Sequence, residues 1–455
     1  MSWQNSRISM AAGALLRPHT PQGGLIRAFI LMIILGTAAL ALPCCQARPV
    51  SLSDCFFIAV SAVCVTGLCP LDFSVCFTPC GQAVTLTLMQ LGGLGVLTFA
   101  ALAFRVVGAQ ISLSSQAALT DSVMQKDAAG EFREIFGKIV VLLLGLEAAG
   151  AVLMVGDLWL GRGAPLPQAM WQGAFHAVSA FCNAGFTLWD NSLAGQDAFF
   201  CVIIMLLIFC GGIGQVAMVE IAGFFSQLLR PCARAPRSHF SYNTKVVLII
   251  SCAMVALGLL TLLIMTGISG RTLPFFPSLF HAVSARTAGF TCFSTDCLTR
   301  PDKLVTIFLM FVGGSPGSCA GGIKTTALAI WLATVYATLR NREEYTFLGR
   351  QIPKLVVEKA RKLIQFTIIW NIFGVFLLCL TEGQTDVLTL IFEQVSAFGT
   401  VGLSLDYTPH LSEYGKLWIC LCMFVGRIGP LTLALGITPL HPAKFAHPEG
   451  KIMIG

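Results

Sequence analysis

The residues best placed to do chemistry are four glycines that recur along the chain at nearly constant spacing. They are Gly67, Gly185, Gly289 and Gly402, separated by 118, 104 and 113 residues. The segments that hold them read SAVCVTGL (61–68), SAFCNAGF (179–186), SARTAGFT (284–291) and SAFGTVGL (396–403). Glycine lacks a Cβ, so it allows dihedrals that point successive backbone carbonyls to one side. Carbonyls arranged around one axis can replace the hydration shell of a cation.

The fourth segment contains Thr-Val-Gly, which resembles the first part of the TVGYG potassium filter. The first has a shorter version, and the middle two have degenerate ones. The candidate cation-binding residues are Val65, Thr66, Gly67, Asn183, Ala184, Gly185, Thr287, Ala288, Gly289, Thr400, Val401 and Gly402. Glycines that let helices pack closely are the alternative. Four aligned glycines favour a filter over that alternative.

The composition indicates what must position these segments. Of 455 residues, 56% are hydrophobic and only 11% are charged, against about 25% charged in an average soluble protein. So few charges exclude a soluble multidomain protein, and so apolar a chain excludes disorder. The net charge of +7 does not indicate nucleic-acid binding, because the basic residues form no stripe on one module. A polytopic membrane protein remains.

Eight apolar stretches are long enough to cross a bilayer, which needs roughly 20 residues per helix. They are 25–42, 82–104, 135–156, 199–222, 245–267, 304–338 (interrupted), 362–381 and 415–437. Shorter apolar stretches precede every second span, at 53–65, 169–183, 275–287 and 387–400. These are too short to cross, and they fit either re-entrant half-helices or core helices of a soluble domain. The absence of any other soluble domain favours re-entrance.

The spans and half-helices combine into one unit that occurs four times: a span (M1), a half-helix (P), a glycine segment and a second span (M2). We therefore expect an all-α polytopic membrane protein with eight transmembrane helices and four re-entrant pore helices around a pseudo-fourfold pore. The predicted divisions are a tail 1–24, repeats 25–106, 134–226, 244–340 and 360–438, and a tail 439–455. Non-helical backbone at membrane depth is tolerated where it lines a cavity or is buried in protein.

Charge sets the orientation. With the N-terminus inside, 20 of the 29 lysines and arginines fall inside, six fall outside and three fall at membrane depth, as the positive-inside rule expects. The predicted location is the inner (plasma) membrane, multi-pass, with a cytoplasmic N-terminus. Acidic residues lean outside, which would concentrate cations at that mouth, although ordinary polar loops explain this excess too.

The sixth span is interrupted by five glycines and a proline within 313–322, which cannot continue a helix. A broken helix at membrane depth marks an ion site or a gate, and a simple kink is the alternative. Arg427 and Lys324 are costly charges nearby. We expect Arg427 to contact this segment or place a cationic barrier in the conduction path, the alternative being a pair with Glu147 or Glu220. The candidate gate residues are Gly313, Gly314, Ser315, Pro316, Gly317, Ser318, Gly321, Gly322, Lys324 and Arg427.

Other signals are weaker. Arg286 is expected to anchor the third pore loop rather than to contact ions. His176 and His281 share one position in their repeats, so packing is expected rather than metal binding. Several outer cysteines leave disulfides open, and their pairing cannot be deduced from sequence. No Walker motif occurs, and no catalytic constellation converges, so an enzyme is not expected.

The chain resembles the Trk/Ktr/HKT superfamily of potassium uptake proteins from about residue 21 to 438. The resemblance rests on the four glycine segments, on GGSPGSCAGGIKTT at 313–326 and on MFVGRIGPLT at 423–432. The Ktr-type membrane subunit is the closer match, because it has eight spans. ILGTAALALP at 34–43 and FRVVGAQISL at 104–113 also look like Ktr-type sequence.

The resemblance implies a potassium-selective, channel-like pore, a homodimer in the membrane, and a cytoplasmic ring of nucleotide-binding RCK-type regulatory subunits. It implies that K⁺ is the transported ion and that 313–322 is an intramembrane gate. A serine in the first loop accompanies sodium transport in HKT relatives, and this chain has Gly67 there. A sodium-coupled potassium symporter, or another sodium/potassium secondary transporter, is the rival reading, with Na⁺ as a second cargo.

Overall fold

The computed structural model describes residues 21–94, 132–229, 240–268, 274–342 and 344–429. Several predicted parts therefore lie wholly or partly outside the described residues. They are most of the 1–24 tail, residues 95–106 at the end of the first repeat, 430–438 at the end of the fourth, and the 439–455 tail.

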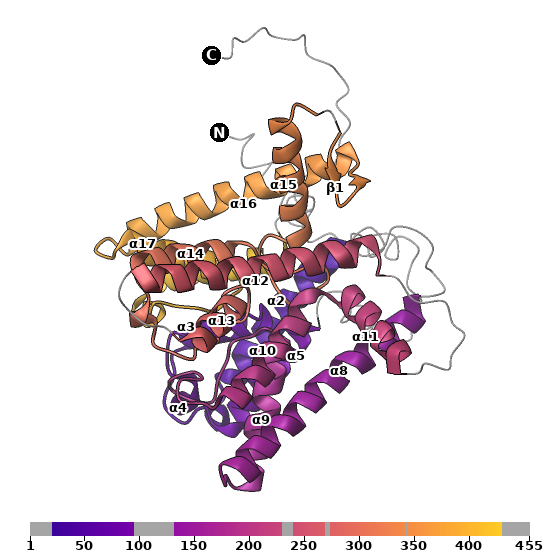
Figure 1. Cartoon of the computed structure of the whole chain (residues 1–455). Helices are drawn as coiled ribbons and strands as arrows, with labels where there is room; N and C mark the ends of the chain where they lie inside the picture. Colours follow the sequence, from indigo (N-terminus) through magenta and orange to yellow (C-terminus); the bar gives the residue numbers. More distant parts are fainter. Residues whose placement is uncertain (1–20, 95–131, 230–239, 269–273, 343, 430–455) are drawn as a thin grey trace.

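Each of the first two units has a helix before and a helix after a shorter half-helix, and the last helix of the second unit is bent into two parts (Figure 1). Unit one consists of α2 (Pro21–Leu40), the 3₁₀ turn η1 (Pro43–Cys45), α3 (Leu52–Val63), α4 (Phe73–Cys76) and α5 (Pro79–Gly93). Unit two consists of α8 (Phe132–Gly156), the π-helical turn η2 (Asp157–Gly161), α9 (Leu166–Phe181), α10 (Ala198–Ile213) and α11 (Gln215–Leu229).

The other two units repeat this order, and a protruding hairpin joins them. Unit three consists of α12 (Tyr242–Ile268), α13 (Phe275–Ser284), η3 (Thr295–Cys297), α14 (Arg300–Phe311) and α15 (Thr325–Leu339). The strands β1 (Thr346–Phe347) and β2 (Arg350–Gln351) follow, with Thr346 opposite Gln351. Unit four consists of α16 (Lys354–Thr381), α17 (Val387–Gly399), η4 (Thr408–His410) and α18 (Glu413–Ile428). The fold is therefore mostly helical, as expected.

The four units close into a ring. The M2 helix of each unit contacts the half-helix of the next: α5 packs on α9, α10 on α13, α14 on α17, and α18 returns to α3. This cyclic order places all four half-helices around one centre. It also buries them: Phe57, Phe175, Phe280 and Phe392 are each at most 1% exposed.

Local sequence fixes where the short helices begin. Ser51 accepts a hydrogen bond from Asp54 N at 3.1 Å and caps α3. In α14, Thr299 and Asp302 form a reciprocal capping box, which satisfies two donors that a helix start leaves open. Proline occupies the first turn of α5, α9 and α14, where its missing N–H costs nothing. The half-helices thus lie within a few residues of their predicted ranges.

The predicted span 199–222 is formed by two helices rather than by one straight helix. The helix breaks at Gly214, and α10 and α11 meet at an angle of 116°. Gly214 has φ +95°, a backbone conformation that L side chains rarely adopt. The interruption predicted in the sixth span is present between α14 and α15.

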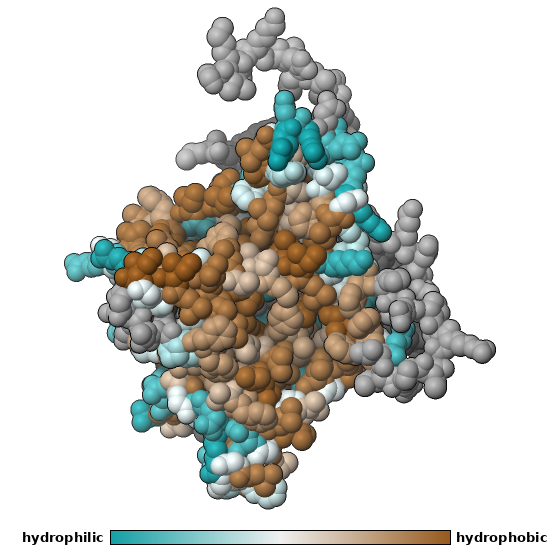
Figure 2. Space-filling model, viewed as in Figure 1, coloured by the Kyte–Doolittle hydropathy of each residue, from teal (hydrophilic) through white to brown (hydrophobic). Residues whose placement is uncertain are grey.

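The molecule carries a broad apolar surface. In Figure 2 hydrophobic residues cover most of the visible face, and hydrophilic ones gather at its upper and lower ends. Val141, Leu260, Ile369 and Phe376 are each more than half exposed, which suits contact with lipid. Among the described residues, three helices are long and apolar enough to span a membrane, at Ile139–Gly161, Tyr242–Ile268 and Lys354–Thr381, or four if α10 and α11 count as one.

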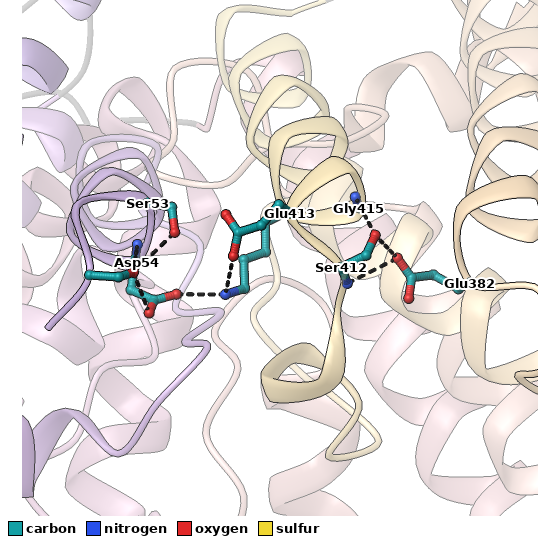
Figure 3. Close-up of polar contacts among 8 residues, drawn as sticks. Ser53, Asp54, Glu382, Ser412, Glu413 and Gly415 are labelled. Carbon is teal, nitrogen blue, oxygen red and sulfur yellow. Dashed lines mark hydrogen bonds and ion pairs between the residues drawn. The ribbon is translucent and has the colours of Figure 1, made fainter.

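The join between units four and one is polar at one end (Figure 3). Lys416 Nζ of α18 lies 2.8 Å from Asp54 Oδ1 of α3 and 3.2 Å from Glu413 Oε1. Ser412 caps α18 by accepting from Gly415 N, and its own N–H and hydroxyl donate to Glu382 at 3.1 and 2.5 Å. The start of α18 is therefore held both to its own unit and to the first.

Candidate cation site

The four recurrent glycines, here called the ring glycines, follow the ends of the half-helices. Gly67, Gly185, Gly289 and Gly402 have φ values of +90°, +70°, +77° and +89°. An L side chain adopts such dihedrals only at a cost of roughly 1–2 kcal/mol. The backbone conformation alone therefore calls for glycine in all four loops.

Each ring glycine also approaches the loop of the next unit. A Cβ built on Gly67 would collide with the carbonyl oxygen of Ala184, and one on Gly185 would lie 2.7 Å from that of Ala288. The same holds between Gly289 and Val401 O.

The cycle closes between Gly402 and Thr66 O. Every unit thus places the carbonyl of the residue before its own ring glycine against the ring glycine of the preceding unit. The described residues form a closed ring of four backbone segments, which helix packing between a pair of glycines would not produce.

The half-helices favour positive charge at the loops through their dipoles, and they fix the loops through hydrogen bonds. Their C-terminal ends, which carry the negative end of the helix dipole, lead into the loops. Ser61 Oγ accepts from Gly67 N at 3.0 Å. Ser179 Oγ and Ser284 Oγ donate to the carbonyls of Phe186 and Phe290 at 2.8 and 2.6 Å. The serine that opens the repeated segment therefore ties the loop to the half-helix in the first three units. In the fourth unit, Ser396 Oγ is buried with no hydrogen-bond partner among the described residues.

The third loop is one residue shorter than the others. Serine precedes the ring glycine by six residues in loops one, two and four, but Ser284 precedes Gly289 by five. In the three longer loops the residue two before the glycine is left-handed: Val65, Asn183 and Thr400 have φ values of +56°, +59° and +49°. Thr287, at the matching place, has no positive φ. The shorter loop reaches the ring without that turn.

A second set of glycines, on the M2 helices, supports the ring. Gly92, Gly211 and Gly426 are so close to the carbonyls of Val63, Phe181 and Phe398 that a Cβ would collide with them. Those carbonyls belong to the residue four before each ring glycine. The sequence signal was available in LGGLG (91–95), CGGIG (210–214), VGGSPG (312–317) and VGRIG (425–429), but sequence reasoning on the loops alone missed it.

The predicted gate segment, 313–322, forms a closed loop between α14 and α15. Val312 pairs with Ile323 in a parallel bridge, and Thr325 N donates to Gly314 O at 3.1 Å. Gly317 and Gly322 have φ values of +70° and +69°. The two ends of the segment are thus adjacent, and its middle projects away from its own helices.

The segment reaches the units on both sides of its own. Ser315 N donates to Gly212 O at 3.0 Å, and Cys319 N donates to Gly211 O at 3.2 Å. Toward unit four, Gly321 N donates to Thr400 Oγ1 at 3.0 Å.

Unit one is reached by Cys319 Sγ, which lies 3.0 Å from Gly93 O. The segment therefore contacts all three other units and touches the fourth loop at Thr400, two residues before its ring glycine.

Arg427 lies in the last turn of α18 and hydrogen-bonds two backbone carbonyls, those of Cys319 and Gly92. The contact expected with the 313–322 segment is present. The alternative partners are engaged elsewhere: Glu147 accepts from Gln90 at 2.9 Å, and Glu220 accepts from Ser241 N at 2.9 Å. Arg427 therefore fastens the segment to unit one. Lys324 Nζ donates within the segment's own turn, to Ala320 O at 2.6 Å.

Arg286 is 8% exposed and lies in the third loop. Its Nη2 approaches Ser251 Oγ at 3.4 Å and Gly313 O at 3.3 Å. It thus connects the shortened loop to M1 of its unit and to the first residue of the 313–322 segment, as an anchor would.

Buried polar side chains of the half-helices contact the chain that follows the ring glycines. His176 Nε2 accepts from Leu188 N at 3.4 Å, and Glu393, fully buried at the same repeat position, accepts from Leu405 N at 3.1 Å. His281, their counterpart in the third unit, instead lies 3.0 Å from Thr306 Oγ1 on M2. The histidines therefore pack and orient loops, and neither contacts the other.

The structure thus brings all twelve predicted cation-binding residues into four adjoining loops, and the 313–322 segment touches one of them at Thr400. A model of the TrkH family, described as cation transport protein, matches residues 13–447. The Ktr system potassium uptake protein B of Bacillus subtilis is 33% identical over 453 residues, covering 96% of this chain and 97% of that protein. The potassium/sodium uptake protein NtpJ of Enterococcus hirae is 30% identical over 448 residues, covering 94% and 95%.

Among solved structures, the potassium transporter TrkH from Vibrio parahaemolyticus has a TM-score of 0.71 and 19% identity, covering 93% of this chain and 86% of that one. That likeness concerns the fold. The family model and the curated relatives each span nearly the whole chain. This chain therefore belongs to the TrkH family of cation transport proteins.

Proposed function

We propose that this protein takes up potassium through a channel-like pore whose selectivity filter is the ring formed by residues 65–67, 183–185, 287–289 and 400–402. The observation that carries the proposal is the closed cycle in which each ring glycine lies against a carbonyl of the next loop. Four carbonyls at one level can replace water around a dehydrated cation, and four helix C-termini favour positive charge there.

Potassium is the proposed cargo for two reasons. Relatives that match nearly the full chain are named for potassium uptake, and all four loops keep glycine at the ring. The basic residues gather on the side assigned to the cytoplasm. With the N-terminus inside, the membrane potential draws K⁺ inward.

The proposed gate is the 313–322 segment. It contacts the other three units and touches Thr400 at the ring, so it lies across the route that a cation leaving the ring would take. Arg427 holds it through the carbonyl of Cys319. Opening would require that contact to break.

We also propose a homodimer and a cytoplasmic ring of nucleotide-binding subunits. The supporting feature is the protrusion made by α15, the β1–β2 hairpin and the start of α16 (Figure 1). It carries Arg340, Arg342, Arg350 and Lys354. Anionic lipid headgroups are the other candidate for this basic surface. Pull-down of the regulatory ring by the wild-type chain, and its loss when these four residues become glutamine, tests the docking proposal.

Gly402→Ser tests the filter. The added side chain would collide with Thr66 O in a loop where φ is +89°, so the ring must widen and the preference for K⁺ over Na⁺ should fall by at least about tenfold, an energy of 1.4 kcal/mol. The measurement is the ratio of rubidium to sodium flux in proteoliposomes.

Gly195→Ser is the matched control, because Gly195 has φ +86° with open space around it. It should keep the wild-type ratio. An unchanged ratio in Gly402→Ser protein that is folded by gel filtration would remove the filter assignment.

A sodium-coupled mechanism remains the rival, because one relative is named a potassium/sodium uptake protein. Rubidium uptake with and without sodium separates the two. A pore conducts rubidium in the absence of sodium, whereas a symporter does not.

Arg427→Gln tests the gate. Its loss removes the guanidinium bonds that join the segment to unit one and leaves only the weaker contact of Cys319 Sγ with Gly93 O, so rubidium uptake without the regulatory subunits should rise several-fold. Lys324→Gln removes only a bond inside the segment's own turn and should change uptake less. Wild-type uptake and regulation in Arg427→Gln would contradict the gate.

A further inference from the structure

Three cysteine side chains converge at one end of the first unit, away from the ring. Cys44 and Cys45 belong to the turn after α2, and Cys80 lies in the first turn of α5. The Sγ atoms of Cys45 and Cys80 are 3.6 Å apart, and those of Cys44 and Cys45 are 4.0 Å apart. All three sulfur atoms lie within 4.8 Å of one another.

These separations suit one metal ion between the sulfurs. A thiolate–zinc distance of about 2.3 Å places neighbouring sulfurs of a tetrahedral site about 3.8 Å apart, and those of a trigonal site about 4.0 Å apart. A disulfide would need two sulfurs at about 2.05 Å, and the structure has none among these three residues. Three convergent thiolates with no oxygen ligand favour soft or borderline ions.

The backbone around the three thiols is held rigidly. Thr78 N donates to Cys45 O at 3.0 Å, and Thr78 Oγ1 donates to Cys44 O at 2.7 Å. Gly81 is so close to Cys45 O that a Cβ there would collide with it. These contacts fix the α2 turn against the start of α5, so little ordering would accompany binding.

Exposure fits a site that an ion can enter. Cys45 is 1% exposed, whereas Cys44 and Cys80 are exposed, so one ligand forms the floor and two form the mouth. A bound cation would displace the thiol protons of its ligands.

We propose that Cys44, Cys45 and Cys80 form a binding site for a single thiophilic metal ion, of the class of Zn²⁺, Cd²⁺ or Cu⁺. The bound ion joins the end of M1 to the start of M2 in the first unit. The proposed orientation of the chain places this site on the outer side of the membrane. The site is distinct from the ring, where backbone oxygens are the only ligands proposed.

Cd²⁺ is the probe, added to the full-length protein in detergent with its thiols kept reduced. The expected result is a thiolate-to-cadmium charge-transfer absorption that saturates at one ion per chain. Because losing a group that merely supports a ligand costs about 10–100-fold in affinity, removal of a ligand in Cys45→Ser or Cys80→Ser should cost at least about 100-fold.

Cys297→Ser, which changes an exposed cysteine of the third unit, is the matched control and should bind Cd²⁺ like the wild type. Cys80 is exposed, so the Cys80→Ser protein should fold, and it tests the site even if the Cys45→Ser protein does not fold. Absorption that persists unchanged in Cys80→Ser would overturn the proposal. So would a Cys45–Cys80 disulfide found by peptide mapping of protein prepared without reductant, since the pair would then be a covalent bridge.

Discussion

The third loop reaches the same ring as the other three by a different route. Its glycine has the same left-handed φ and the same approach to its neighbour. The loop is nonetheless one residue shorter, and it lacks the left-handed residue found at Val65, Asn183 and Thr400. The guanidinium of Arg286 instead reaches Gly313 O. The ring is therefore symmetric at its glycines and asymmetric in what holds them.

This difference lies where the conduction path is proposed to be gated. The 313–322 segment leaves M2 of the third unit, and Arg286 of the third loop contacts its first residue. The three regular units supply M2 glycines that pack against their own half-helices. The third unit supplies the longer interruption, 313–322, in addition to the bend at Gly214 in the second unit. In the proposed function, the fourfold geometry holds the cation, and the departure from it in the third unit holds the gate segment.

The largest expected effect comes from the ring glycines themselves. Gly185→Ala and Gly289→Ala should lower rubidium uptake alike, because each adds a Cβ against a neighbouring carbonyl at positive φ, and the strain alone is about 1–2 kcal/mol. Gly195→Ala has a similar φ and open surroundings, so it should retain transport. If Gly289→Ala transports normally while Gly185→Ala does not, the symmetry of the ring at its glycines is disproved.

Much of this arrangement is readable from sequence, since its signals are local. Glycine at fixed spacing marks the ring, and a cluster of glycine and proline marks the break at 313–322. The lengths of the apolar runs separate half-helices from spans to within a few residues.

The features that cannot be predicted from the sequence involve residues far apart in the chain or contacts with backbone atoms. The partners of Arg427 are carbonyls, whereas sequence offers only carboxylates such as Glu147 as candidates. The break at Gly214 is not evident because most of 199–222 is apolar and glycine within a helical pattern is tolerated, although CGGIG (210–214) places three glycines there. The M2 glycines were missed because only the loop segments were aligned, although the repeat in Gly92, Gly211 and Gly426 is visible once M2 is compared.

Arg286 should show an intermediate effect that is confined to the third unit. Arg286→Met removes the hydrogen bonds to Ser251 and Gly313, and bonds of a charged donor contribute about 1.5–3 kcal/mol each. We expect a lower melting temperature and altered basal rubidium uptake. Cys64→Ala changes the matching position of the first loop and should alter neither uptake nor its regulation. Equal changes in uptake from both variants would mean that Arg286 only stabilises the fold.

The smallest expected effect concerns Glu393 and His281, two buried side chains at the same repeat position that differ in whether they hydrogen-bond the chain after the ring glycine. Glu393→Gln keeps the shape of a side chain that accepts hydrogen bonds from Ser404, Leu405 N and Thr408. It replaces a carboxylate oxygen by a donor that faces other donors, so we expect a cost of about 1–3 kcal/mol and a modest fall in the rubidium-to-sodium ratio. His281→Gln should cost less and leave that ratio unchanged, because the hydrogen bond of His281 goes to Thr306 on M2, and only a ring contact with Phe293 reaches the chain after its glycine. A fall in the ratio for His281→Gln equal to that for Glu393→Gln would show that the third loop is supported like the others.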